Sequence, residues 1–231
     1  MRSLLIICLV FLVLPVCAQD ETKLVKDLKA KLDKVNDYKA TGKMKIDVSF
    51  INVPPASINV FYKKPNKFKV KKVKGISIIP KSGVSININS LLSNDNYKAV
   101  SAGQKEVSGI VTKAVMLIPM QENSEVVLMT LYIDEKNLLL LKTSITTREN
   151  GSYEIDMSYG KYSSWGLPDK VIFSFNTKDY KLPKGLTLEY EKGGKKKDAK
   201  IKNKKGSVEI TYSSYVINKG VDEKEFSPDK S

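Results

Sequence analysis

The chain has 231 residues, a formal net charge of +14 and no histidine. Its two cysteines stand at positions 8 and 17, so no Ser-His, Cys-His or histidine-metal site can form after residue 17. Acidic residues are scattered among turns and no glycine-rich phosphate loop follows a strand pattern, so we expect no enzyme, no cofactor and no metal.

The N-terminus has the pattern of a secretory signal peptide. Arg2 precedes an apolar run over 4–14, and the small-residue triplet 16–18 follows. This run is well short of the roughly 20 residues that span a bilayer. We therefore expect cleavage after Ala18, with residues 1–18 as the signal peptide.

Lipidation at Cys17 is the alternative, because residues 14–17 loosely resemble a bacterial lipobox and a diacylated cysteine would anchor the protein to a membrane. With cleavage, the mature chain over 19–231 is one soluble domain without disulfides, and its stability must come from a core. Outside the cytosol, a lysine-rich surface favours anionic lipid head groups over nucleic acid as partners. Lysines that serve solubility alone are the other interpretation.

The first element of the mature chain is an amphipathic helix over 20–38. Leu24, Leu28, Leu32 and Val35 recur at helical spacing, with charged residues between them and no proline or glycine. The helix therefore has one apolar stripe that needs a partner surface.

From Gly42 onward a period of two replaces the helical spacing and predicts strands with one apolar face. Turns at 53–55 and 63–66 divide this region into three strands. Nine alternating side chains share the inward face and are candidates to line an apolar cavity, an ordinary packed core being the alternative. They are Met44, Ile46, Val48, Phe50, Ile58, Val60, Tyr62, Phe68 and Val70.

The rest of the chain predicts a meander of antiparallel strands. Asn150-Gly151 is a strong signal for a hairpin turn. Residues 150–152 also match the motif of a glycosylation acceptor, but the turn explains them better. Residues 75–103 are irregular and fit a short helix or a loop. Strands are expected over 114–118, 126–133, 138–141, 153–159, 171–175, 186–191 and 207–212.

Several of these strands are apolar on both faces and need cover on both sides. A strongly curved sheet that wraps the single helix or encloses a cavity would provide it. The sequence therefore predicts a mainly β, α+β domain.

In this order the elements resemble the LolA-like group of periplasmic lipoprotein carriers. The helix over 27–35 and the following Met44 strand resemble the opening of LolA. Residues 62–68 are similar to the group's strand that ends in a basic-basic-proline turn and leads into an aromatic residue. Weaker matches lie over 106–119 and 131–142.

The resemblance implies a single curved antiparallel sheet that forms an incomplete barrel with a helical lid. It implies a periplasmic carrier that binds the acyl chains of lipoproteins or lipids and delivers them towards the outer membrane, with an inner-membrane donor complex and an outer-membrane acceptor. Lys64 stands where the carrier has an arginine that helps to hold the lid closed. Lysine cannot make the forked contacts of a guanidinium, so Lys64 would hold a lid differently.

Two further interpretations remain open. The same fold could serve as a non-enzymatic envelope sensor or a structural lipoprotein-binding protein. A lysine-rich stretch could engage an anionic membrane or an acidic partner, or it could be a solvated hairpin tip. Its candidate residues are Lys195, Lys196, Lys197 and Lys200.

Overall fold

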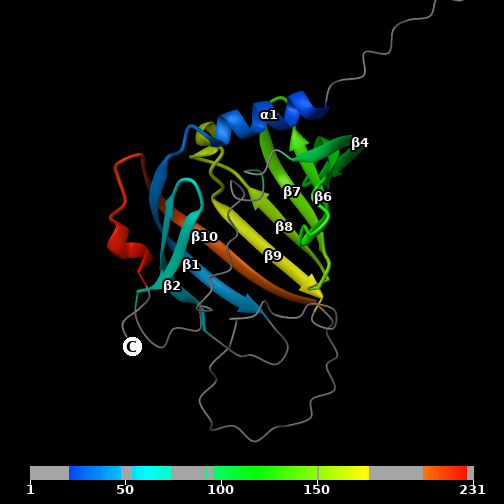
Figure 1. Ribbon diagram of the computed structural model, residues 1–231. Helices are drawn as coiled ribbons and strands as arrows, with labels where there is room; N and C mark the ends of the chain where they lie inside the picture. Colours follow the sequence, from blue (N-terminus) through cyan, green and yellow to red (C-terminus); the bar gives the residue numbers. More distant parts are fainter. Residues whose placement is uncertain are drawn as a thin grey trace, which may run out of the picture.

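The computed structural model describes residues 21–47, 54–73, 92, 96–149, 151–176 and 205–227. One strongly curved sheet dominates it, and a helix lies across the open side of that sheet (Figure 1). The elements, with η for a 3-10 helix, are α1 (Glu21–Leu32), β1 (Asp37–Asp47), β2 (Ala56–Lys63), β3 (Lys67–Lys72), β4 (Tyr97–Val107), β5 (Ile110–Pro119), β6 (Val126–Asp134), β7 (Leu139–Thr147), β8 (Ser152–Ser158), η1 (Ser163–Trp165), β9 (Lys170–Asn176), β10 (Lys205–Ile217) and η2 (Glu223–Phe226).

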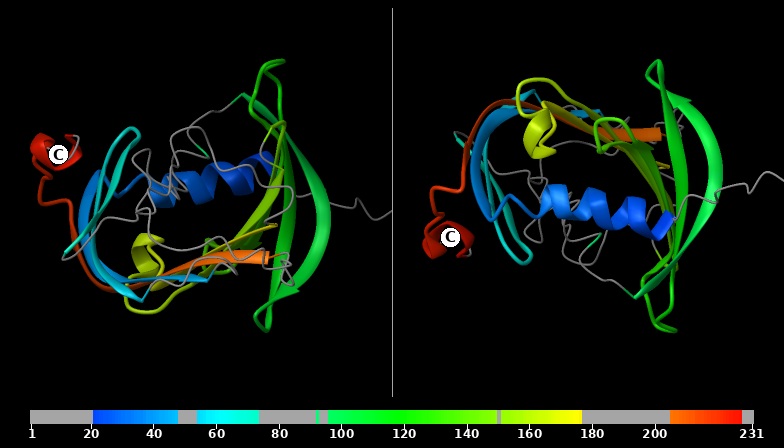
Figure 2. Two further views of the ribbon diagram at one scale, coloured as in Figure 1. Left: turned by 90° about the horizontal axis from the view of Figure 1, so that it is seen from below. Right: turned by 90° about the horizontal axis from the view of Figure 1, so that it is seen from above.

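The ten strands form a single antiparallel sheet in the order β3-β2-β1-β10-β9-β8-β7-β6-β5-β4. From β4 the chain meanders to β10, which pairs with β1 and so joins the last strand of the chain to the first. Within the described strands, the edges β3 and β4 do not pair with each other. Figure 2 shows the sheet curving around α1. The predicted incomplete barrel with a helical lid is thereby confirmed.

Gly42 lies at an irregularity in the pairing of β1 with β10. The pairing of β1 with β10 shifts register between Thr41 and Gly42, and such a bulge increases the local twist of a strand. A Cβ atom at Gly42 would lie 2.4 Å from the carbonyl oxygen of Thr211. Only glycine therefore allows the two backbones to approach this closely where the sheet curves.

Two apolar clusters fill the concave face. The buried stripe of α1 packs with inward side chains of β5 to β9. The second cluster joins β1, β2, β3 and β10 and contains several tyrosines. The Tyr38 ring centroid lies 5.3 Å from those of Tyr62 and Tyr215, and the Tyr212 centroid lies 5.0 Å from that of Tyr215. These aromatic contacts tie strands from both ends of the sequence together.

The helix is shorter than its periodicity predicts, since α1 ends at Leu32 and Tyr38 lies in β1. Val35 is buried, as its spacing suggested, but it packs in the second cluster beneath the helix-strand connection. The expected helix over 20–38 was wrong at this end because the apolar spacing continues into a segment whose backbone bonds to β10 and to the β2–β3 turn.

The irregular interpretation of residues 75–103 was also wrong over its last part, because β4 begins at Tyr97. Most side chains of β4 are exposed or half-buried on both faces, as suits an edge strand, so no alternation marks it in the sequence. The β7–β8 hairpin is confirmed: the Gly151 carbonyl accepts hydrogen bonds from the Thr147 amide and hydroxyl at 3.0 and 2.8 Å. The expected strand over 186–191 lies outside the described residues.

No helix among the described residues is long and apolar enough to cross a membrane. The expected signal peptide and Cys17 lie outside the described residues, so both stay predictions.

Candidate functional site

The inward face of β1, β2 and β3 carries the side chains that the alternating pattern predicted to line a cavity. Seven of the nine candidates are described, and all seven lie in or against one apolar cluster. Met44, Ile58, Val60, Tyr62 and Val70 are buried in it, and Ile46 and Phe68 are half-buried against it. Val48 and Phe50 lie outside the described residues. Contact of these side chains with a ligand stays a prediction.

The other half of the concave face lies beneath α1. Val25 and Leu28 of the helix are 0% exposed and pack in one cluster with Leu131, Ile133 and Ile145 of the sheet. Sequence reasoning missed these sheet positions as candidates, because β6 is apolar on both faces and its inward side cannot be told from its outward side. The α1 stripe therefore covers an apolar surface in addition to the predicted one.

Lys64 contacts the C-terminal end of α1. Its Nζ donates a hydrogen bond to the carbonyl oxygen of Asp33 and lies 3.2 Å from the Asp33 carboxylate. The Lys64 amide donates to the carbonyl of Asn36 at 2.9 Å. A cation is favourable at this end of a helix dipole. The partly exposed ion pair itself contributes at most about 1 kcal/mol.

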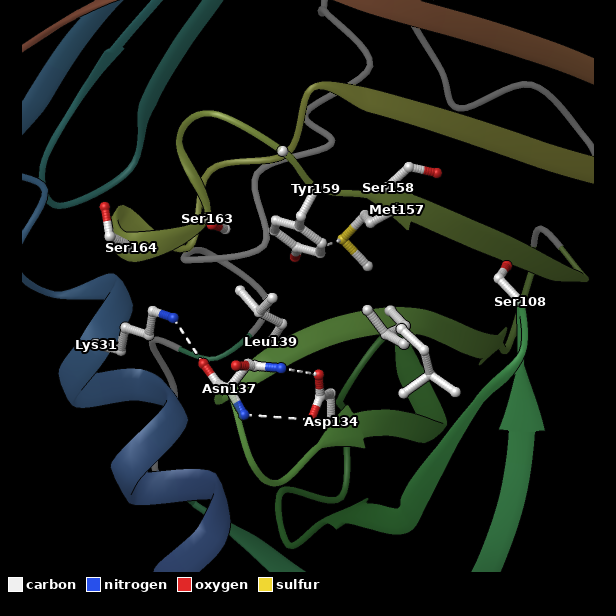
Figure 3. A pocket seen from close by; sticks show the side chains of 13 residues that line it. Lys31, Ser108, Asp134, Asn137, Leu139, Met157, Ser158, Tyr159, Ser163 and Ser164 are labelled. Carbon is white, nitrogen blue, oxygen red and sulfur yellow. Dashed lines mark hydrogen bonds between the residues drawn. The ribbon is translucent and has the colours of Figure 1, made fainter.

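Lys31 connects the last turn of α1 to the β6–β7 turn. Its ammonium donates to the carbonyl of Asn137 at 2.7 Å, and the Asn137 amide side chain in turn donates to Asp134 at 2.7 Å (Figure 3). Burial and then the neighbouring Lys34 lower the pKa of Lys31, while Asp134 opposes this shift. The helix thus rests on a turn whose shape is held by its own side chains.

Lys113 contacts the N-terminal end of α1. It projects inward from β5, with its side chain 11% exposed, and its Nζ lies 3.3 Å from the Glu21 carboxylate. A hydrogen bond from its own backbone amide, followed by the Lys113 side chain, lowers the pKa of Glu21. Lysines therefore fasten both ends of the helix to the sheet.

A pocket of about 550 Å³ opens beside α1 where β7 and β8 separate (Figure 3). The β7–β8 ladder ends at the pair Lys142 and Asp156, and beyond it the Tyr159 hydroxyl donates to the carbonyl of Leu140 at 2.8 Å. Both apolar and polar side chains line the pocket. Its lining includes Leu139, Leu141, Met157 and Tyr159, with Lys31, Asp134, Asn137, Ser108, Ser158, Ser163 and Ser164.

A second pocket of about 260 Å³ lies on the hairpin side of α1, between the end of the helix and the β2–β3 turn. Leu32, Tyr62 and Pro65 supply apolar lining, and Lys64 lies at its edge. The two pockets therefore flank the C-terminal half of the helix, and both adjoin the apolar clusters that α1 covers.

The described residues of this site present mainly apolar side chains. Among the described residues, no group of three or more acidic or cysteine side chains is placed to hold a metal ion. The lysine-rich candidates at 195–200 lie outside the described residues. What the site offers is an apolar concave surface, a helix that occupies it, and polar contacts around the rim.

Comparison with known proteins supports the fold. No family model matches the sequence, and no curated protein sequence matches it. A solved domain from Vibrio parahaemolyticus, assigned to outer membrane lipoprotein sorting, aligns with a TM-score of 0.56 at 13% identity, covering 89% of this chain and 95% of that one. A LolA superfamily protein from Nitrosomonas europaea aligns with a TM-score of 0.53 at 9% identity, covering 89% and 98%. The chain therefore has a LolA-like fold.

Proposed function

We propose that this LolA-like half-barrel is a carrier that buries the acyl chains of lipoproteins or lipids between its concave face and α1. We further propose that it works in the periplasm after removal of residues 1–18, and that it passes its cargo from an inner-membrane donor towards an outer-membrane acceptor. Enzymatic chemistry is not part of the proposal, because reversible burial is sufficient for carriage.

The observation that carries the proposal is the apolar stripe of α1. Leu24, Val25, Leu28 and Leu32 occupy the surface that an acyl chain would need. Burial of each such side chain contributes about 1.5–3 kcal/mol. An acyl chain gains about 0.8 kcal/mol for each buried methylene, so a chain of ordinary length can replace what the helix loses when it moves away.

The polar contacts of the helix suit a lid that has to move. Glu21, Asp33 and Lys31 hold α1 through two ion pairs and two hydrogen bonds to carbonyl oxygens. The Lys64–Asp33 pair is partly exposed and therefore weak, and the cost of desolvating the more buried Glu21–Lys113 pair offsets its attraction. These contacts therefore orient the helix without adding much to the cost of displacing it. Release then requires an acceptor that offers comparable burial, which agrees with a carrier function.

Native mass spectrometry of the protein isolated from its own host tests the proposal. We expect stoichiometric lipid or acylated peptide to accompany the protein. The mass of the mature N-terminus also distinguishes cleavage after Ala18 from lipidation at Cys17. An apo mass combined with no uptake of an added fluorescent fatty acid would contradict carriage and would favour the sensor or structural alternative.

Two adjacent residues provide a matched pair of variants. Ile46 is half-buried on the concave face, whereas Lys45 is exposed on the opposite face of the same strand. Ile46→Glu places a charge where the chain would lie and should greatly weaken fatty-acid uptake, whereas Lys45→Glu should leave it nearly unchanged. Circular dichroism confirms that both variants fold. Equal uptake by the two variants would contradict this lining.

A further inference from the structure

The C-terminal end of α1 is held by a residue that is distant in sequence. Asn218, just after β10, donates from Nδ2 to the carbonyl of Lys34 at 2.8 Å and accepts from the amide of Asn36 at 2.7 Å. Its φ of 54° lies in the left-handed region, which asparagine tolerates better than most residues. One side chain therefore fixes both sides of the connection between the helix and β1.

Backbone contacts reinforce this connection. The Asn218 amide donates to the carbonyl of Asp37 at 2.9 Å, and the Gly220 amide donates to the Asp37 carboxylate at 2.9 Å. The β2–β3 turn approaches from the other side through Lys64, which bonds to Asp33 and Asn36. The segment after β10 and the β2–β3 turn therefore both hold the connection between α1 and β1.

The N-terminal end of α1 has a different kind of attachment. The ion pair between Glu21 and Lys113 reaches it from β5, and Ser101 of β4 adds a hydrogen bond to the Glu21 carboxylate. Both contacts are made by side chains. Among the described elements, no strand precedes this end of the helix in the chain, whereas the other end continues directly into β1.

We infer that α1 opens as a lid hinged at its C-terminal end, so that Glu21 swings away from β4 and β5 while Asp33 stays against Lys64. The inference rests on the proposed function, because it assumes that cargo displaces the helix. It assigns Lys64 to the hinge and the Glu21–Lys113 pair to the latch.

The direction of opening decides which apolar residues separate first. Leu24 and Val25 lie near the latch and leave the sheet before Leu32, which lies next to the hinge. Figure 2 shows the N-terminal end of α1 on the side of β4 and β5. An acyl chain would therefore enter from that side of the half-barrel and would replace the first-turn side chains before the rest.

Two cleavable cross-links test the direction. Residues 19–231 contain no cysteine, so each variant of this chain can carry one introduced pair of cysteines and no others. Glu21→Cys with Ser101→Cys locks the proposed latch, and Asp33→Cys with Lys64→Cys locks the proposed hinge. Both pairs are bridged with a disulfide-containing bis-maleimide, and the readout is uptake of a fluorescent fatty acid before and after reduction.

We expect the latch cross-link to abolish uptake and reduction to restore it. The hinge variant should take up as much probe when it is cross-linked as the same variant does after reduction. Loss of uptake with the hinge cross-link alone would overturn the inference. Normal uptake with the latch cross-link would overturn it as well, since α1 would then not be the gate. Failure of the unmodified chain to take up any probe would instead contradict the proposed function itself.

Discussion

Gly42 shows how one residue sets the shape of the sheet. Its backbone faces that of Thr211 so closely that a Cβ atom would collide with a carbonyl group. Gly42→Ala should lower the free energy of unfolding by about 1–3 kcal/mol, because β1 and β10 must separate where the sheet bends. Urea unfolding measures this. Lys43→Ala, at the next and exposed position, is the control, and equal effects of the two changes would contradict the explanation.

Asn218 illustrates a long-range contact made by one side chain. Asn218→Gly keeps the left-handed backbone but removes the bonds to Lys34 and Asn36, and should cost about 1–3 kcal/mol of stability. Asn218→Asp keeps the acceptor for the Asn36 amide but turns a carboxylate oxygen toward the Lys34 carbonyl oxygen, so it should cost at least as much as the glycine variant. Thermal unfolding ranks the three proteins. An aspartate variant as stable as the parent would argue against the donor role of Nδ2.

At the scale of elements, η2 fastens the end of the chain to the edge hairpin. Lys63 and Lys67 lie 2.6 and 2.5 Å from the two carboxylate oxygens of Glu223, and Lys71 lies 2.6 Å from Glu225. Hydrogen bonds from Lys63 and Lys67 lower the pKa of Glu223. Beside edge strand β3, this charged segment also discourages pairing with another chain.

The double variant Glu223→Gln and Glu225→Gln should therefore lower the melting temperature slightly at low salt. The difference from the parent protein should disappear near 1 M salt, where the Debye length is about 3 Å. Because the folded-state pKa of Glu223 is lowered, its contribution is present at neutral pH and is lost as the pH falls through that folded-state pKa. A difference that persists at high salt would point to packing in place of charge.

At the scale of the whole molecule, a tyrosine cluster joins β1, β2 and β10. Burial raises the pKa of Tyr38, Tyr212 and Tyr215. A raised folded-state pKa contributes stability that is complete below the unfolded value of about 10 and is lost as the pH rises above it. We therefore expect stability to be steady up to about pH 10 and to fall beyond it.

Tyr212→Phe should reduce this alkaline fall, because one phenol that must ionise on unfolding is removed. Guanidinium unfolding at about pH 8 and about pH 11 measures the fall in each protein. Tyr132→Phe, at a half-buried position outside this cluster, is the control. A fall of equal size in the parent and in the Tyr212 variant would show that other groups cause it.

Local periodicity was sufficient to predict an element and its buried side wherever only one face of that element is buried. Leu24, Leu28 and Leu32 predicted α1, and the alternation from Met44 to Val70 predicted the inward face of the first strands, because each period reports which side leaves water. The sequence by itself therefore determined the helix, most strands, the β7–β8 hairpin and the shared face of the seven described candidates.

Only the tertiary structure decided the features that depend on distant partners. Tyr97 begins an edge strand with no buried face to mark it, and the inward side of β6 is defined by the helix that covers it. The end of α1 depends on Asn218, 184 positions from Lys34. The physical reason is that the spacing of apolar residues indicates which side chains are buried. Which distant residue each of them contacts depends on the path of the chain in three dimensions.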